Sequence, residues 1–296
     1  MKNKTLFCSV IIFVFLQISC SSQQSRSKSS VVDFLYPAEL NAVIQPSIPT
    51  LNIPLKVGIA FVPDQTSVTR GGNQWTGISA SESGLTSARK TELLEKVGSS
   101  FKELSFVSDI EVIPAEYLQP GGSFNNLEQI QTMYGIDIIA LVSYDQVQFT
   151  DEGVLSLTYW TIVGAYVVSG EMNDTSTMLD TVVYDIKSKK MLFRAPGTSV
   201  VKGSATPVNL SKQLREDSLK GFNIASEEMT KNLHMQLTRF KENIKKNPEQ
   251  VNIVHREGYS STGGGAFNFY ELIIFLLIVF AKNIAGSINR GKKRIL

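Results

Sequence analysis

Few side chains in this chain of 296 residues combine a type and a spacing that could do chemistry. Its two histidines, His234 and His255, have neither the HxxxH spacing nor the Glu motif of a zinc site, so both are expected at the surface or partly packed. The best acidic group is Asp145, Asp151 and Glu152. Such carboxylates could act as general acid and base or bind a hard cation, and the alternative is a solvated loop. We predict no catalytic residue, no metal site and no cofactor.

The amino end carries a different chemistry. Lys2 and Lys4 precede a largely apolar run, 6–16, which is too short to span a bilayer core of about 30 Å but suits a signal peptide. Ser19 and Cys20 follow, and a small residue directly before a cysteine resembles the lipobox of bacterial lipoproteins. In that class the cysteine becomes the first mature residue and its sulfur carries diacylglycerol. We predict a lipoprotein signal peptide over 1–19 and lipidation of Cys20; the alternative is an incidental cysteine in an ordinary signal.

The segment 20–30 that follows is rich in serine and has no apolar residue after the cysteine. It is predicted to be a flexible tether. Ser21 and Ser22 stand where many lipoproteins retained at the inner membrane carry Asp, so resemblance to that sorting pattern favours the outer membrane. Because Cys8 lies in the removed signal, the mature chain has one cysteine, which excludes a disulfide within one mature chain.

The carboxyl end repeats this arrangement in reverse. Gly263, Gly264 and Gly265 close a polar linker, 248–265, and the segment 266–296 has an apolar run and a basic end. The apolar part is long enough to cross a hydrocarbon core, and the basic residues place the terminus in the cytoplasm, so the domain before it lies outside. Two interpretations stay open: a permanent single-pass anchor, or a sorting signal that a membrane protease cuts at the glycines.

Between the two ends, 31–247 is predicted to be one periplasmic or surface α/β domain with a mixed sheet and packed helices. Buried strands are expected over 55–63, 105–114 and 136–144. Helices are expected from a cap at Thr86 or Ser87 to about 104 and from a cap at Asn125 or Asn126 to Gly135. A strand, helix, strand, helix, strand order favours a parallel or mixed core.

The second half of the domain is antiparallel in character. A period-two strand is expected over 153–170, followed by a hairpin of 177–186 with 191–195. A long amphipathic helix is expected over 211–246 and ends at Asn247-Pro248. In the first half, Trp75 lies in a long Gly/Ser/Thr-rich loop and is the best candidate for a partner contact; packing of the loop onto the domain is the alternative.

Four segments in this order resemble the rhombotarget lipoprotein family: SSVVDFLYP (29–37), YWTIVGAY (159–166), FRAPGTS (193–199) and ATPVNL (205–210). That family pairs a lipoprotein signal with a carboxyl-terminal sorting segment, which a rhomboid-type intramembrane protease, the rhombosortase, is proposed to cleave near its glycines. The resemblance implies lipidation at Cys20 and cleavage in the region of Gly263, Gly264 and Gly265. It implies nothing about the ligand of the folded domain.

The charge balance excludes some partners. A total of 29 Lys and Arg against 27 Asp and Glu excludes a strongly basic nucleic-acid binder. The segment 31–262 carries 20 Lys and Arg against 26 Asp and Glu, a formal charge of −6, so nucleic acid and anionic lipid are not expected as its ligands. No phosphate-loop motif and no Gly-x-Ser-x-Gly elbow occurs.

Two classes of function remain. The favoured hypothesis is a non-enzymatic lipoprotein of the bacterial envelope, anchored in lipid through Cys20, handled by lipoprotein-processing enzymes and a rhomboid-type sorting protease, whose domain binds an envelope protein or wall component. One alternative is a wall-modifying hydrolase that uses Asp145 and Asp151 as acid and base. The other is a bitopic lipoprotein that keeps its C-terminal helix.

Overall fold

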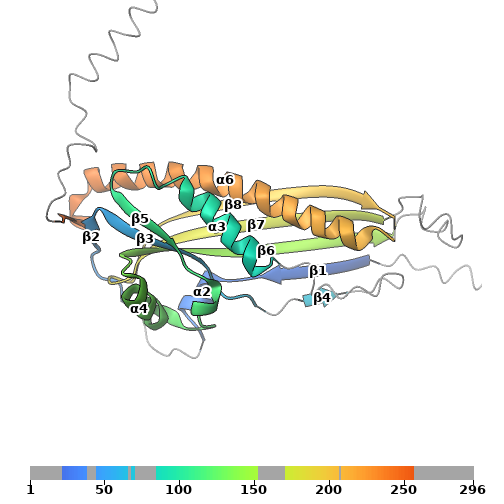
Figure 1. Cartoon of the computed structure of the whole chain (residues 1–296), viewed down its shortest axis with the longest axis horizontal. Helices are drawn as coiled ribbons and strands as arrows, with labels where there is room; N and C mark the ends of the chain where they lie inside the picture. The colour runs from blue at the N-terminus through green and yellow to red at the C-terminus, as the bar shows by residue number, and fades with distance from the viewer. Residues whose placement is uncertain are drawn as a thin grey trace, which may run out of the picture. The chain divides into compact units, whose positions relative to one another are not determined.

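The computed structural model describes residues 22–38, 45–65, 68–70, 85–152, 171–206 and 208–256. Its centre is a mixed seven-stranded sheet of order β4-β1-β6-β3-β5, with β7 paired to the other edge of β6 and β8 paired to β7 (Figure 1). The strands are β1 (Ser22–Lys28), β3 (Leu55–Phe61), β4 (Val68–Arg70), β5 (Val107–Val112), β6 (Ile138–Glu152), β7 (Glu171–Asp185) and β8 (Lys190–Ala205). The predicted α/β class with a mixed sheet is confirmed.

Strand β6 connects the two parts of this sheet, because two different strands pair with successive stretches of one of its edges. Its first residues, from Ile138 to Val142, pair in parallel with β3. Its last residues, from Asp145 to Asp151, pair antiparallel with β1. We call β1, β4 and the paired residues 145–152, 171–178 and 198–205 the distal arm, and the remainder of the seven-stranded sheet the proximal sheet.

Helices cover both faces of the proximal sheet, which gives three layers. Helices α3 (Ser87–Ser99) and α6 (Leu210–Lys246) pack on one face with a large apolar cluster that includes Leu94, Phe222 and Met229. Helices α2 (Val31–Leu35) and α4 (Ser123–Tyr134) pack on the other face with a second cluster. Among the described residues, α6 is the helix that continues from the proximal sheet along the distal arm (Figure 1).

The helix ends follow the capping expectations in part. Thr86 caps α3 by accepting a hydrogen bond from the Arg89 amide, and Gly135 ends α4 with a left-handed φ of 63°. The expected cap of α4 at Asn125 or Asn126 is wrong, because Gly122 is the N-cap. Asn126 is buried inside the helix, where its Oδ1 accepts a hydrogen bond from the Gln119 amide at 2.9 Å.

Two segments expected to be tethers are paired strands instead. In the predicted tether 20–30, residues Ser22–Lys28 form β1 along the edge of β6. The edge of a sheet offers backbone donors and acceptors to any extended chain, and this pairing needs no apolar side chain. In the predicted linker 248–265, Asn252–His255 form β9 beside β2 (Thr50–Ile53), a parallel pair outside the main sheet. The short helices η2 (Ala115–Tyr117) and η4 (Pro248–Gln250) complete the elements.

Several predictions lie outside the described residues: the signal peptide over 1–19, Cys20, Trp75, the strand over 153–170, the glycine cluster and the segment 266–296. Within the described ranges, no helix is both long enough and apolar enough to cross a membrane.

Candidate functional site

The acidic group Asp145, Asp151 and Glu152 does not form a catalytic pair. All three residues lie on β6, and Asp145 and Asp151 are six positions apart on one continuous strand, so their Cα atoms are separated by about 20 Å. Carboxylates that act together on a glycosidic bond stand roughly 5–10 Å apart. The hydrolase hypothesis built on these two residues is therefore wrong in its geometry.

Asp145 has a structural partner on β1. The Arg26 guanidinium donates through Nε to Oδ1 of Asp145 at 2.9 Å and through a second nitrogen to Oδ2, a bidentate pair. The hydrogen bonds and charge of Asp145 raise the pKa of Arg26. This pair joins β1 to β6 on the face of the distal arm opposite α6, so the Asp145 carboxylate helps to hold β1 in place.

The two histidines lie on the surface, as predicted. His234 is exposed on α6, where its ring stacks on Phe101 with 4.3 Å between ring centroids and 17° between planes. His255 is exposed on β9. Among the described residues, no three His, Cys, Asp or Glu side chains gather as metal ligands do.

A buried charged cluster that the sequence analysis did not identify stands beyond the carboxyl end of β3. The Nζ of Lys90, on α3, lies 2.5 and 2.7 Å from the two carboxylate oxygens of Asp64, which follows β3. The ammonium also lies 5.8 Å from the ring centroid of Phe61 and 5.4 Å from that of Tyr144. The Lys90 side chain is 8% exposed and that of Asp64 46% exposed, so this ion pair is closed on one side and reaches water on the other.

The electrostatics of this cluster do not favour a nucleophile. Burial raises the pKa of the Tyr144 hydroxyl, and the charge of Asp64 and a hydrogen bond to its carboxylate add to the increase. Tyr144 therefore stays protonated throughout the neutral range, and the ammonium of Lys90 is held in its ion pair with the Asp64 carboxylate. The backbone amide of Tyr144 is held as well, because it donates to Oγ of Ser29 at 3.1 Å.

The Lys90 cluster instead fixes the two ends of the segment that contains Trp75. On one side, Asp64 is held by Lys90, and the Gln65 amide donates to the Lys28 carbonyl at 2.9 Å. On the other side, Leu85 is buried directly before α3. A signal for Lys90 was present in the sequence: it occupies the apolar stripe of α3 with Leu93, Leu94 and Val97, at spacings of three, four and seven.

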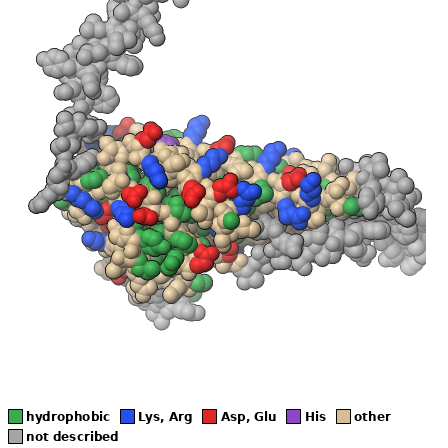
Figure 2. Space-filling view, in the orientation of Figure 1, with side chains coloured by type: hydrophobic (Ala, Val, Ile, Leu, Met, Phe, Trp, Pro, Cys, Tyr) green, Lys and Arg blue, Asp and Glu red, His purple; other side chains and the backbone are tan. Residues whose placement is uncertain are grey.

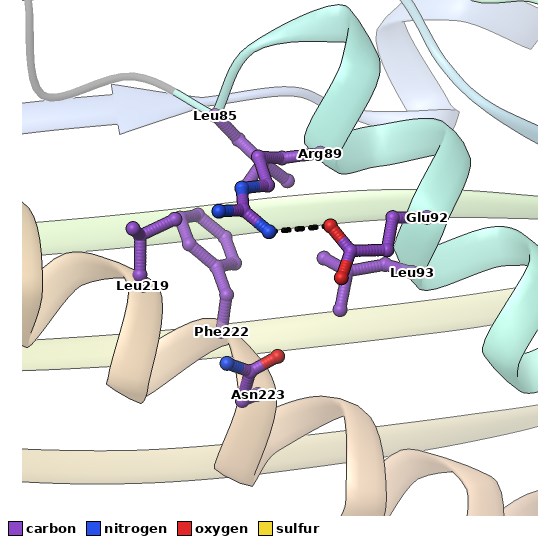
Figure 3. A pocket seen from close by; sticks show the side chains of 7 residues that line it. All are labelled: Leu85, Arg89, Glu92, Leu93, Leu219, Phe222 and Asn223. Carbon is purple, nitrogen blue, oxygen red and sulfur yellow. Dashed lines mark hydrogen bonds and ion pairs between the residues drawn. The ribbon is translucent and has the colours of Figure 1, made fainter.

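A small pocket lies beside this cluster, between α3 and α6 (Figure 3). Its volume is about 80 Å³, and apolar walls from Leu85, Leu93, Leu219 and Phe222 lead to a polar rim. At the rim Arg89 and Glu92, both on α3, form an ion pair of 2.5 Å above the Phe222 ring (Figure 3). Ligand pockets for cofactors and drug-sized molecules measure about 300–1,000 Å³. This pocket can hold water or the tip of one side chain.

The interface between α6 and the distal arm is polar and fully buried, a second feature that sequence reasoning missed. Gln146 donates through Nε2 to Oγ1 of Thr177 at 2.7 Å, and its Oε1 accepts from Oγ of Ser218 at 2.6 Å. One pleat further along, Gln148 donates to Oγ1 of Thr175 at 3.1 Å and to the Leu214 carbonyl at 2.9 Å. We call this set of buried contacts the polar seam.

The polar seam ends in a buried carboxylate. Asp217 on α6 accepts from Nδ2 of Asn173 at 2.5 Å and from Nε2 of Gln213 at 3.0 Å. Gly203 lies against the same two side chains, since a Cβ there would stand 2.5 Å from Asp217 and 2.9 Å from Asn173. The polar seam therefore has the close packing of a structural interface and leaves no room for a ligand at this point.

Comparisons with known proteins leave the family of this chain open. No protein-family model matches it, and no curated protein matches it. Among solved structures, a chain described as a neuraminyllactose-binding hemagglutinin homolog from Helicobacter pylori superposes with a TM-score of 0.31 and 10% identity, over 72% of this chain and 97% of that one. A TM-score this low supports no argument about fold or function.

Proposed function

We propose that this chain is a bacterial envelope lipoprotein, anchored through an acylated Cys20, whose α/β domain is a non-enzymatic binding module for an envelope partner. The observation that carries the proposal is the position of β1. Its first residue, Ser22, stands two positions after Cys20. A domain that starts this close to the cysteine fits maturation at Cys20, because cleavage before that residue leaves every described element intact.

The binding role is supported by how the charged residues are used. Asp145 is paired with Arg26, Lys90 with Asp64, and Asp217 with amide donors, all in contacts that hold elements together. The pocket of about 80 Å³ is too small for a substrate of ordinary size. A binding surface needs none of these groups to be reactive.

For the carboxyl end we propose processing by a rhomboid-type sorting protease in the region of Gly263, Gly264 and Gly265. The support is the sequence resemblance, together with the position of β9. This strand ends at His255, before the glycines, so removal of the segment after them would leave the described fold complete.

The first test is intact mass and lipid labelling of the protein recovered from bacterial membranes. We expect a diacylated Cys20 at the amino end and a carboxyl end near the glycine cluster. Cys20→Ala should accumulate as unlabelled precursor that keeps residues 1–19. Cys8→Ala is the matched control, since it removes the chain's other cysteine from the discarded segment, and it should be labelled normally.

Two results would contradict the proposal. Normal maturation of Cys20→Ala would show that Cys20 is not the lipidation site. Chains that still end at Leu296, in cells that possess the protease, would favour the permanent-anchor alternative. The binding role is tested separately by crosslinking in intact cells from the lipoprotein itself. Turnover of a wall substrate without any crosslinked envelope component would favour an enzyme.

A further inference from the structure

The first paired residue of the domain fixes which end of the fold is nearest to Cys20. Ser22 pairs with Asp151 at the tip of the distal arm. Two residues of extended chain span at most about 7 Å, so an acyl group on Cys20 would sit next to this tip. Because the segment expected to be a tether is the paired strand β1, only two positions along the chain separate Cys20 from the tip.

Other elements meet at the same tip. The last residue of β6 pairs with the first of β7, Glu152 with Glu171, and Glu171 in turn pairs with Ala205 at the end of β8. Helix α6 begins just beyond, at Leu210. Among the described residues, the ends of β1, β6, β7 and β8 and the first turns of α6 therefore meet at this tip (Figure 1).

The pair of β2 and β9 lies at the other end of the domain. Its last rung, Ile53 with His255, directly precedes Leu55, where β3 begins beside the start of β6. From Ile138 to Asp151 the continuous strand β6 extends about 43 Å, at roughly 3.3 Å per residue. The chain therefore enters the domain at one end and leaves it at the opposite end (Figure 1).

The exposed side chains near the tip suit a lipid headgroup layer. Val208 is 48% exposed directly before α6, and Lys202, Lys212 and Arg215 are exposed around it. Lys and Arg side chains are visible near this end of the helix in Figure 2, with acidic side chains among them. Glu216 forms an exposed pair with Lys212 at 3.8 Å. Aliphatic and long basic side chains are tolerated where phosphates meet acyl chains.

We propose that the tip of the distal arm rests on the bilayer that holds acylated Cys20, and that the sheet, along the full length of β6, holds the β2–β9 end about 40 Å away from that bilayer. The inference rests on the proposed function, because it needs an acyl group on Cys20. The position is imposed by the anchor and not by charge attraction, which agrees with the net charge of −6 over 31–262.

Removal of the carboxyl-terminal segment is part of this arrangement. The segment 256–265 can extend over roughly 35 Å at most, which is shorter than the length of about 43 Å that β6 covers from Ile138 to Asp151. A chain with residues 266–288 embedded in the same bilayer could not keep the β2–β9 end at that height. Cleavage at the glycines would therefore allow the domain to stand upright on its lipid anchor.

Distance from the bilayer can be measured with single-cysteine variants of the full-length lipoprotein, purified from membranes after its own processing. The thiol of Cys20 is blocked by the lipid and Cys8 is removed, so an introduced cysteine is the one reactive thiol. The pair Val208→Cys and Ile253→Cys is matched, since the two aliphatic residues are 48% and 43% exposed. Met178→Cys, 39% exposed, reports from the border between the distal arm and the proximal sheet.

Each variant carries a thiol-linked fluorophore and is placed in phosphatidylethanolamine and phosphatidylglycerol vesicles with nitroxide headgroups, which quench at contact range. We expect quenching at Val208 several-fold stronger than at either Met178 or Ile253. In a protein whose mass confirms an acylated Cys20 and a shortened carboxyl end, equal quenching at Val208 and Ile253, or stronger quenching at Ile253, overturns the inference alone. A mass without the acyl group, or with an intact tail, contradicts the proposed function on which it rests.

Discussion

The two halves of α6 lie on one sheet but use opposite chemistry. Over the proximal sheet the helix packs through apolar residues, and over the distal arm it packs through the hydrogen bonds of the polar seam. The change is visible along the face of β6 that α6 covers. From Ala140 to Thr150 each residue on that face is buried, but three apolar residues are followed by three polar ones: Ala140, Val142, Tyr144, Gln146, Gln148 and Thr150.

This difference shows how the register of α6 on the sheet is specified. Apolar packing supplies most of the stabilisation of a core, but it tolerates small shifts of one element along another. Buried amides and hydroxyls are costly unless each finds its partner, so they fix one register. In the polar seam a slip of α6 by one turn would break the hydrogen bonds that cross to the sheet, from Ser218 to Gln146, from Gln148 to the Leu214 carbonyl and from Asn173 to Asp217.

The largest effect is expected where the two halves meet, at Gly197. A Cβ at this residue would stand 2.1 Å from the Ala225 carbonyl oxygen and 2.5 Å from the Met229 amide nitrogen, so α6 must move away from β8. We expect Gly197→Ala to lower the free energy of unfolding by about 3 kcal/mol or more, measured by urea denaturation. Gly135→Ala is the contrast: its Cβ would meet nothing within 4 Å, and only the positive φ costs about 1 kcal/mol. Equal losses would refute the close contact at Gly197.

The proximal half of α6 is tested by Phe222→Ala. The Phe222 side chain is 1% exposed and meets Tyr144 edge-on, with 5.5 Å between ring centroids. Removing it should lower the free energy of unfolding by roughly 3–4 kcal/mol, because a cavity replaces the ring. The neighbouring exposed residue provides the control, and Asn223→Ala should change stability by less than about 0.5 kcal/mol. A loss below that of Ser218→Ala would mean that the halves do not differ as described.

The polar seam is tested by Ser218→Ala, which leaves Oε1 of Gln146 buried without its donor. We expect a loss of about 1–2 kcal/mol, and the double variant with Gln146→Met should lose less than the sum of the two single losses, because the hydrogen bond between these side chains is lost only once. The exposed Ser204→Ala on β8 is the matched control. A double variant whose loss equals the sum of the single losses would show that the two side chains are not coupled.

The smallest effect concerns pH at the boundary residue Tyr144. Its pKa is raised in the folded protein by burial and by Asp64, so the folded state holds this proton more tightly than the unfolded state does. The resulting stabilisation is complete below the unfolded pKa of about 10 and decreases as pH rises above it. In Tyr144→Phe, the free energy of unfolding measured in urea should decrease less steeply between neutral pH and about pH 11 than in the parent. A steeper fall in the variant would reverse the sign of the argument.

What the sequence predicted well is periodic and apolar. The long helix was expected over 211–246 and is observed over Leu210–Lys246, because its apolar residues recur at spacings of three and four. The end of α4 at Gly135 follows from the conformational freedom of glycine. Strand β3 and the first part of β6 were found because buried parallel strands are nearly continuous apolar runs, whereas β5 at the sheet edge also carries Ser108, Asp109 and Glu111.

What the sequence missed is polar but buried. The hairpin was expected to end at Thr177 and Ala195, yet β7 begins at Glu171 and β8 continues to Ala205. The expected strand over 136–144 likewise continues as β6 to Glu152. In each case the apolar alternation stops where the polar seam begins, although the backbone pairing goes on. Strand β1 was missed because its pairing relies on backbone hydrogen bonds that no side-chain pattern records.

The pairing of β1 also sets an order on folding. Arg26 and Asp145 are 119 positions apart in sequence, so β1 cannot pair with β6 until nearly half of the chain after it has been made and brought back. Closing a loop of this length is a slow, non-local step compared with forming α3 or α4. The segment that adjoins Cys20 therefore cannot join β6 during the early part of synthesis. Under the proposed lipidation of Cys20, that delay would leave a period in which the modifying enzymes can reach the cysteine before β6 closes beside it.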